Sequence, residues 1–107
     1  MIAHILQVPI VKYYARIASL ILNKPIPLLD YTDIMQAERF WILVTNRKDV
    51  TPKVIAMELS TTLEAAEKIV RASIDRQGHL TLISQELTEE ITRAMAQEKR
   101  KQRLAGA

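Results

Sequence analysis

The chain has 107 residues, a length that predicts one domain with a modest hydrophobic core. Apolar residues make up 49% and charged residues 25%, which is typical of a soluble globular protein and argues against extensive disorder. Cysteine is absent, which excludes disulfides and thiolate metal sites and fits a cytoplasmic location. The most apolar run, Val8–Leu22, is interrupted by Lys12 and Arg16 and is too short to cross a bilayer, so we expect no membrane partner.

The net charge of +3 is unevenly distributed along the chain. Between residues 51 and 80 the charges cancel, with Lys53, Lys68, Arg71 and Arg76 set against Glu58, Glu64, Glu67 and Asp75. The densest basic cluster lies near the end and comprises Lys99, Arg100, Lys101 and Arg103. A nucleic-acid binder usually carries its positive excess on the docking face, and residues 51–80 have no such excess.

The first predicted helix begins at Pro9, which suits a first helical position, runs to about Leu22, and has Asn23 as its cap. Its polar residues form one narrow stripe, so the helix must be buried on more than one side. We expect it to pack on its own domain and on a second subunit of a homodimer; the alternative is the central core helix of a monomer. The expected dimer interface comprises Ile10, Tyr13, Tyr14, Ile17, Leu20 and Ile21.

An extended connector is predicted over residues 24–29, because its two prolines disfavour regular helix. Thr32 or Asp33 is then expected to cap a second helix that ends near Asn46. Its predicted apolar face contains Ile34, Met35, Ala37, Phe40, Trp41, Leu43 and Val44.

Two short helices separated by a polar turn are predicted next. Thr51 caps the first of them, which begins with Pro52 and ends near Leu59. In the turn, Thr61 and Glu64 have the S/T-x-x-E spacing of a capping box, which starts the following helix.

The fourth helix is predicted to end near Gln77, with Gly78 as its terminator. His79–Ser84 alternates and is rich enough in β-branched residues to predict a strand. Thr88 is expected to cap a last helix, whose acidic start and basic end both complement the helix dipole.

The block from residue 56 to residue 80 has a characteristic spacing of small and apolar residues, namely Ala56, Leu59, Ala66, Val70, Ile74, Gly78 and Leu80. In this spacing it resembles winged helix-turn-helix domains. Ala66 is the small residue that lets the second helix approach closely, and Val70 and Ile74 are expected to continue its buried face. With the preceding helix included, the match covers residues 32–83.

The wing of this family is expected to be short or degenerate here. Gln85 and Glu86 follow the predicted strand without a Gly or Asn turn, and the cap at Thr88 arrives soon afterwards. The expected fold is therefore mostly α, a winged helix-turn-helix with a truncated wing and flanking N- and C-terminal helices. We divide it into residues 1–29 as the dimerisation element, 30–87 as the core, and 88–107 as the C-terminal helix.

The resemblance implies a DNA interface on the second helix of the helix-turn-helix, which would enter the major groove. The expected DNA-binding residues are Lys53, Thr61, Thr62, Glu64, Lys68 and Arg71, with further phosphate contacts at Lys99, Arg100, Lys101 and Arg103. Glu64 and Glu67 oppose binding electrostatically, although a Glu can read a cytosine amino group. The alternative is a solvated helix face, in which Glu64 and Lys68 form an i,i+4 pair.

No catalytic residue, metal site or cofactor is expected. Two Gly residues are too few for a phosphate-cradling loop, and the four serines lie in no nucleophile motif. His4 and His79 are single and far apart in sequence, and Phe40 and Trp41 are read as core residues.

The sequence therefore favours a small dimeric protein that binds double-stranded DNA, of the transcriptional-regulator type. The alternative is a winged-helix module that binds another protein within a larger complex and makes no direct contact with DNA. The neutral recognition face and the truncated wing favour this alternative.

Overall fold

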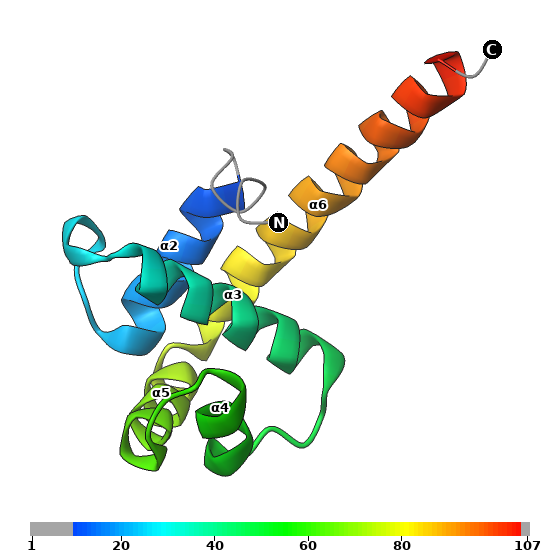
Figure 1. Cartoon of the computed structure of the whole chain (residues 1–107). Coiled ribbons are helices and arrows are strands. Elements are labelled where there is room, and N and C mark those ends of the chain that lie inside the picture. The colour runs from blue at the N-terminus through cyan, green and yellow to red at the C-terminus, as the bar shows by residue number, and fades with distance from the viewer. Residues whose placement is uncertain (1–9, 106–107) are drawn as a thin grey trace.

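The structure is a computed structural model that describes the backbone of residues 10–105 and the side chains of residues 10–103. All regular elements in this range are helical, which confirms the mostly α class and leaves no strand there for a wing. The elements are α2 (Ile10–Leu22), the 3₁₀ turn η1 (Ile26–Leu28), α3 (Tyr31–Asn46), α4 (Pro52–Glu58), α5 (Leu63–Asp75) and α6 (Gln77–Ala105) (Figure 1).

Helix α2 lies at the centre of the fold, where it packs against α3, α5 and α6. It ends as predicted, because Asn23 adopts the left-handed conformation with φ 55°. The Lys24 N–H then donates to the Ser19 carbonyl at 3.3 Å, which satisfies one of the last free carbonyls of the helix. The predicted start at Pro9 lies outside the described residues.

The connector between α2 and α3 is not fully extended as predicted, because one 3₁₀ turn forms within it over Ile26–Leu28. The predicted cap of α3 is also wrong. Asp30 is the N-cap, and its side chain accepts from the Asp33 N–H at 2.8 Å while the Asp33 side chain accepts from the Asp30 N–H at 3.1 Å. This reciprocal capping box is supported by a 3.1 Å ion pair between Lys24 and Asp33. Helix α3 therefore begins earlier than a cap at Thr32 or Asp33 would place it.

Helices α4 and α5 are the two short helices predicted on either side of a polar turn, and this pair is called the α4–α5 hairpin below. The hydroxyl of Thr51 caps α4 by accepting from the Val54 N–H, as expected. The turn depends on Ser60, which adopts φ 53° and lets the Thr61 N–H donate to the Ala56 carbonyl at 2.9 Å.

The cap of α5 is one residue later than predicted. The Thr62 hydroxyl accepts from the Ala65 N–H at 3.1 Å, whereas the capping box was expected at Thr61 and Glu64. The reason is geometric: the left-handed residue at Ser60 uses Thr61 to close α4, so the extended N-cap conformation falls on Thr62.

The predicted strand His79–Ser84 and the predicted cap at Thr88 are both wrong, because α6 runs unbroken through them. Gly78 does not terminate α5 and has no positive φ; the break between α5 and α6 is the single residue Arg76. Leu80, Ile83 and Leu87 recur with helical spacing, and the last two are buried against the bundle. The domain division expected at residue 87 consequently falls inside one helix.

One core comprises side chains from each of the five α-helices in residues 10–105. Its buried apolar members are Tyr13, Tyr14, Ile17, Ala18, Ile21, Ala37, Phe40, Leu43, Ile55, Leu59, Ala66, Ile69, Ile83 and Leu87. The expected burial of Ile74 is wrong: it is 67% exposed, because α5 turns Ala66 and Ile69 inward instead. Ala66 is fully buried, so its small side chain permits the close packing of α5 that its spacing predicted.

Candidate nucleic-acid interface

The α4–α5 hairpin presents most of the side chains expected to contact DNA. Because α5 packs on α2 through Ala66 and Ile69, its opposite face is free. Five of the six expected residues are exposed and one, Thr61, is half-buried; the exposed ones are Lys53, Thr62, Glu64, Lys68 and Arg71. The structure therefore places this set around one hairpin.

The electrostatics of this face are nearly balanced. Glu64 and Lys68 form the i,i+4 ion pair expected of a solvated helix, with 3.9 Å between carboxylate and ammonium, and both side chains are largely exposed. Such a pair contributes little to stability. Within residues 10–103, no ion pair forms at Lys53 or Arg71, so both cations are available to an anionic partner.

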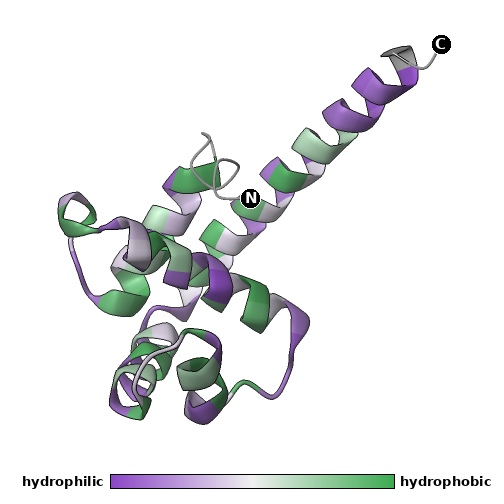
Figure 2. Ribbon diagram, in the orientation of Figure 1, coloured by the Kyte–Doolittle hydropathy of each residue, from purple (hydrophilic) through white to green (hydrophobic). Residues whose placement is uncertain are grey.

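The basic C-terminal cluster, defined as Lys99, Arg100, Lys101 and Arg103, does not join this face. It lies on the part of α6 that projects beyond the bundle, away from α4 and α5 (Figure 1). Lys99 is 22 residues after Gln77 in α6, which corresponds to about 33 Å at the helical rise per residue. Figure 2 shows that this projecting end is predominantly hydrophilic. A short duplex bound at α5 would have to extend along the length of α6 to contact the basic C-terminal cluster.

Most of the side chains assigned to a dimer interface are used inside the chain. Tyr13, Tyr14, Ile17 and Ile21 are buried in the core, whereas Ile10 and Leu20 are partly exposed. Burial raises the pKa of Tyr14 to about 12, with a further contribution from the negative charge of Glu38, so its phenol stays neutral. The surface that α2 leaves for a second copy is therefore small.

Exposed apolar side chains flank the hairpin turn, which the sequence analysis did not single out. Met57 near the end of α4 is 76% exposed, and Leu63 at the start of α5 is 52% exposed. They bracket the Thr62 cap in sequence. Met57 follows the apolar run Val54–Ala56, so nothing in the sequence indicated that its side chain is left outside the core. Leu63 stands alone between Thr62 and Glu64, so no helical pattern marked it.

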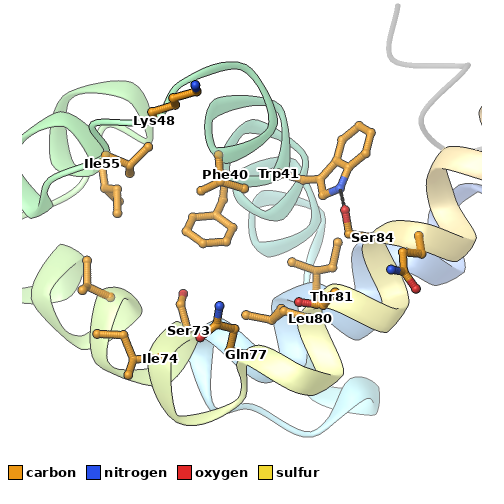
Figure 3. A pocket seen from close by; sticks show the side chains of 15 residues that line it. Phe40, Trp41, Lys48, Ile55, Ser73, Ile74, Gln77, Leu80, Thr81 and Ser84 are labelled. Carbon is orange, nitrogen blue, oxygen red and sulfur yellow. Dashed lines mark hydrogen bonds between the residues drawn. The ribbon is translucent and has the colours of Figure 1, made fainter.

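A groove that the sequence analysis missed separates the hairpin from α3 and α6. Its volume is about 750 Å³, and it is lined by side chains from α2, α3, α4, α5 and α6 (Figure 3). Phe40 points into it from α3, and Trp41 lies at its edge, where the indole N–H donates to the Ser84 hydroxyl at 2.8 Å. Two of its lining residues, Val44 and Ile74, are apolar and were expected in the core. They are 39% and 67% exposed instead.

No metal or cofactor site is evident in the part of the chain that the structure describes. No group of three or more His, Asp or Glu side chains is placed to hold an ion there, and His79 is exposed on α6 while His4 lies outside the described residues. Among the described helices, none is long and apolar enough to cross a membrane.

Comparison of the chain with protein-family models, with curated proteins and with solved structures finds no match. The assignment of the α4–α5 face as an interface therefore depends on its own geometry and chemistry.

Proposed function

We propose that the α4–α5 hairpin binds duplex DNA, with the start of α5 in the major groove. The observation that carries this proposal is the hairpin itself. Two short helices are joined by a tight turn at Ser60, and the second helix exposes Leu63 and Glu64 at its start and the face that carries Lys68 and Arg71. This is the arrangement by which helix-turn-helix proteins present side chains to base edges.

The exposed side chains divide into two roles in this proposal. Lys53, Lys68 and Arg71 supply phosphate contacts, which position the protein without reading sequence. The Thr62 hydroxyl accepts a hydrogen bond as the N-cap and still has its own proton to donate to a base or phosphate. Glu64 partly neutralises Lys68, so we expect weak affinity and a shallow salt dependence compared with a strongly basic reader.

A salt-dependent titration tests this proposal. Binding to a labelled random duplex is measured by fluorescence anisotropy at two salt concentrations, with the wild-type chain and the double variant Lys68→Glu and Arg71→Glu. We expect binding that weakens with salt, and a loss of at least tenfold in the variant, because each phosphate contact releases counterions. The matched control reverses two exposed cations elsewhere, Lys12→Glu and Arg39→Glu, and should bind close to wild type. Equal loss in both variants would show that net charge, and not the hairpin, drives binding.

Assembly as a homodimer that acts as a transcriptional regulator is a separate part of the proposal. Two hairpins related by a twofold axis would address successive major grooves. Sedimentation at micromolar concentration should then give twice the monomer mass. A stable monomer would remove this part and leave DNA binding by one hairpin to be judged by the titration.

A second function, docking on another protein, is favoured by one specific observation. Met57 and Leu63 are strongly exposed beside a charge-balanced face, and interface cores are depleted in charge and enriched in residues such as Met. If no DNA binding is detected at low salt, this alternative takes precedence. In that case Met57→Ser and Leu63→Ser should abolish the protein contact, while Lys68→Glu and Arg71→Glu should leave it.

A further inference from the structure

The groove between the hairpin and the rest of the bundle has a chemistry of its own. Its walls are Phe40 and Val44 of α3, Ile55 of α4, Val70 and Ile74 of α5, and Leu80 of α6. The arrangement in Figure 3 places the α3 side chains opposite those of α5 and α6. Direct packing of α4 on α3 and of α5 on α6 is sparse, because the hairpin is anchored mainly through α5 on α2.

The lining is almost uncharged. Nine of its residues are apolar or aromatic, five are neutral and polar, and Lys48 is the one charged residue; no Asp or Glu lines it. Lys48 lies at the rim, on the segment between α3 and α4 (Figure 3). Concave sites of a few hundred to about 1,000 Å³ with apolar walls and few polar groups are typical of small-molecule sites.

From this combination we propose that the groove binds an amphipathic monocarboxylate, with its apolar body between Phe40 and Ile74 and its carboxylate on Lys48. The apolar walls exclude a strongly polar ligand, because its desolvated groups would lack partners. A lone cation with no acidic neighbour in the lining attracts one negative charge and repels a positive one. An apolar body would also cover Ile74 and Val44, which the chain itself leaves exposed.

The polar residues of α6 support the same orientation. Gln77, Thr81 and Gln85 recur every four residues along one helix edge of the groove, and all three are exposed. These three side chains are neutral, so they add no further charge that a ligand would have to neutralise. They also keep this edge of the groove in contact with water. The charge preference of the site therefore depends on Lys48.

The chain contains one tryptophan, and it lies at the edge of this groove, so ligand binding has a built-in reporter. Decanoate, which does not absorb in the tryptophan range, is titrated against the full chain below its micellar concentration, and Trp41 emission is recorded. Decan-1-ol serves as the uncharged comparison. We expect a saturable change with decanoate and at least fivefold weaker binding of the alcohol.

Three variants locate the site. Lys48→Gln should weaken decanoate at least fivefold and leave decan-1-ol unchanged, whereas Ile74→Glu should abolish both. Leu82→Glu is the matched control, since Leu82 is an exposed apolar residue of α6 outside the lining, and it should bind like wild type. Circular dichroism of each variant confirms that the helices are retained.

The absence of a saturable signal would overturn the proposal, as would equal affinity of acid and alcohol or equal loss in the Ile74 and Leu82 variants. If a second copy or another protein fills the groove, decanoate should give no saturable signal. The measurement contains no DNA, so its failure is distinct from failure of the proposed DNA binding.

Discussion

Substitution of Gly78 by alanine tests whether this residue ends a helix or lies within one. Sequence spacing predicts a helix-terminating glycine, whereas the structure places Gly78 at the second residue of α6 without a positive φ. A Cβ added there would meet no atom within 4 Å. Alanine is favoured over glycine inside a helix by about 0.8–1.0 kcal/mol, and somewhat less near a helix start. We therefore expect Gly78→Ala to raise the free energy of unfolding by about 0.5–1 kcal/mol.

For a domain of this size, that gain corresponds to a rise in Tm of roughly 2–8 °C. Thermal and urea unfolding followed by circular dichroism at 222 nm measure both quantities. The matched control is Asn23→Ala, because Asn23 does adopt a left-handed φ of 55°, where alanine costs on the order of 1 kcal/mol. The two alanine substitutions should have opposite signs. A loss of stability in Gly78→Ala similar to that in Asn23→Ala would refute the continuous α6.

Three further substitutions test the packing and ionisation described above. Leu87→Ala removes a fully buried side chain that anchors α6, and chemical denaturation should show a loss of about 3–5 kcal/mol; a loss below 1 kcal/mol would contradict its burial. Ser84→Ala removes the acceptor of the Trp41 indole, so we expect a loss of roughly 0.5–1.5 kcal/mol and a shift in tryptophan emission, and unchanged emission would argue against this bond. Burial raises the pKa of Glu38, although Arg39 opposes the shift, so the folded state favours the protonated acid. Protonated Glu38 contributes stability below the pKa that this carboxyl has in the unfolded chain, and the contribution is lost as the pH rises through its pKa in the folded chain. Glu38→Gln should consequently be more stable than wild type at pH 7, with the difference shrinking as the pH falls and Glu38 is protonated, and a pH-independent difference would rule out this ionisation.

The parts of the fold that local chemistry determines were predictable from the sequence. The Asn23 terminus and the Thr51–Pro52 start were both confirmed, because each depends on one or two residues with strong conformational preferences. The caps at Asp30 and Thr62 were missed by one to three residues, since neighbouring Asp and Thr side chains compete for the same position and only the path of the preceding turn decides between them.

The stretch from Gly78 to Thr88 was misread for a different reason. Its local composition, with a glycine followed by β-branched residues, favours a strand. The helical spacing of Leu80, Ile83 and Leu87 is evident only over a longer window, and burial against α2 decides in its favour. The groove was missed for a related reason, because a hydrophobic pattern identifies apolar side chains without showing which of them lack a partner.

The central claim, that the exposed face of the α4–α5 hairpin binds duplex DNA, is tested most directly by mapping amide chemical shifts. A ¹H–¹⁵N spectrum of the full chain is recorded with increasing amounts of a short duplex at low salt. The account predicts perturbations concentrated at residues 51–71, including Thr62 and Lys68, with little change at residues 10–22 of the central helix. Unperturbed hairpin amides, or shifts confined to residues 99–103 at the end of α6, would contradict it.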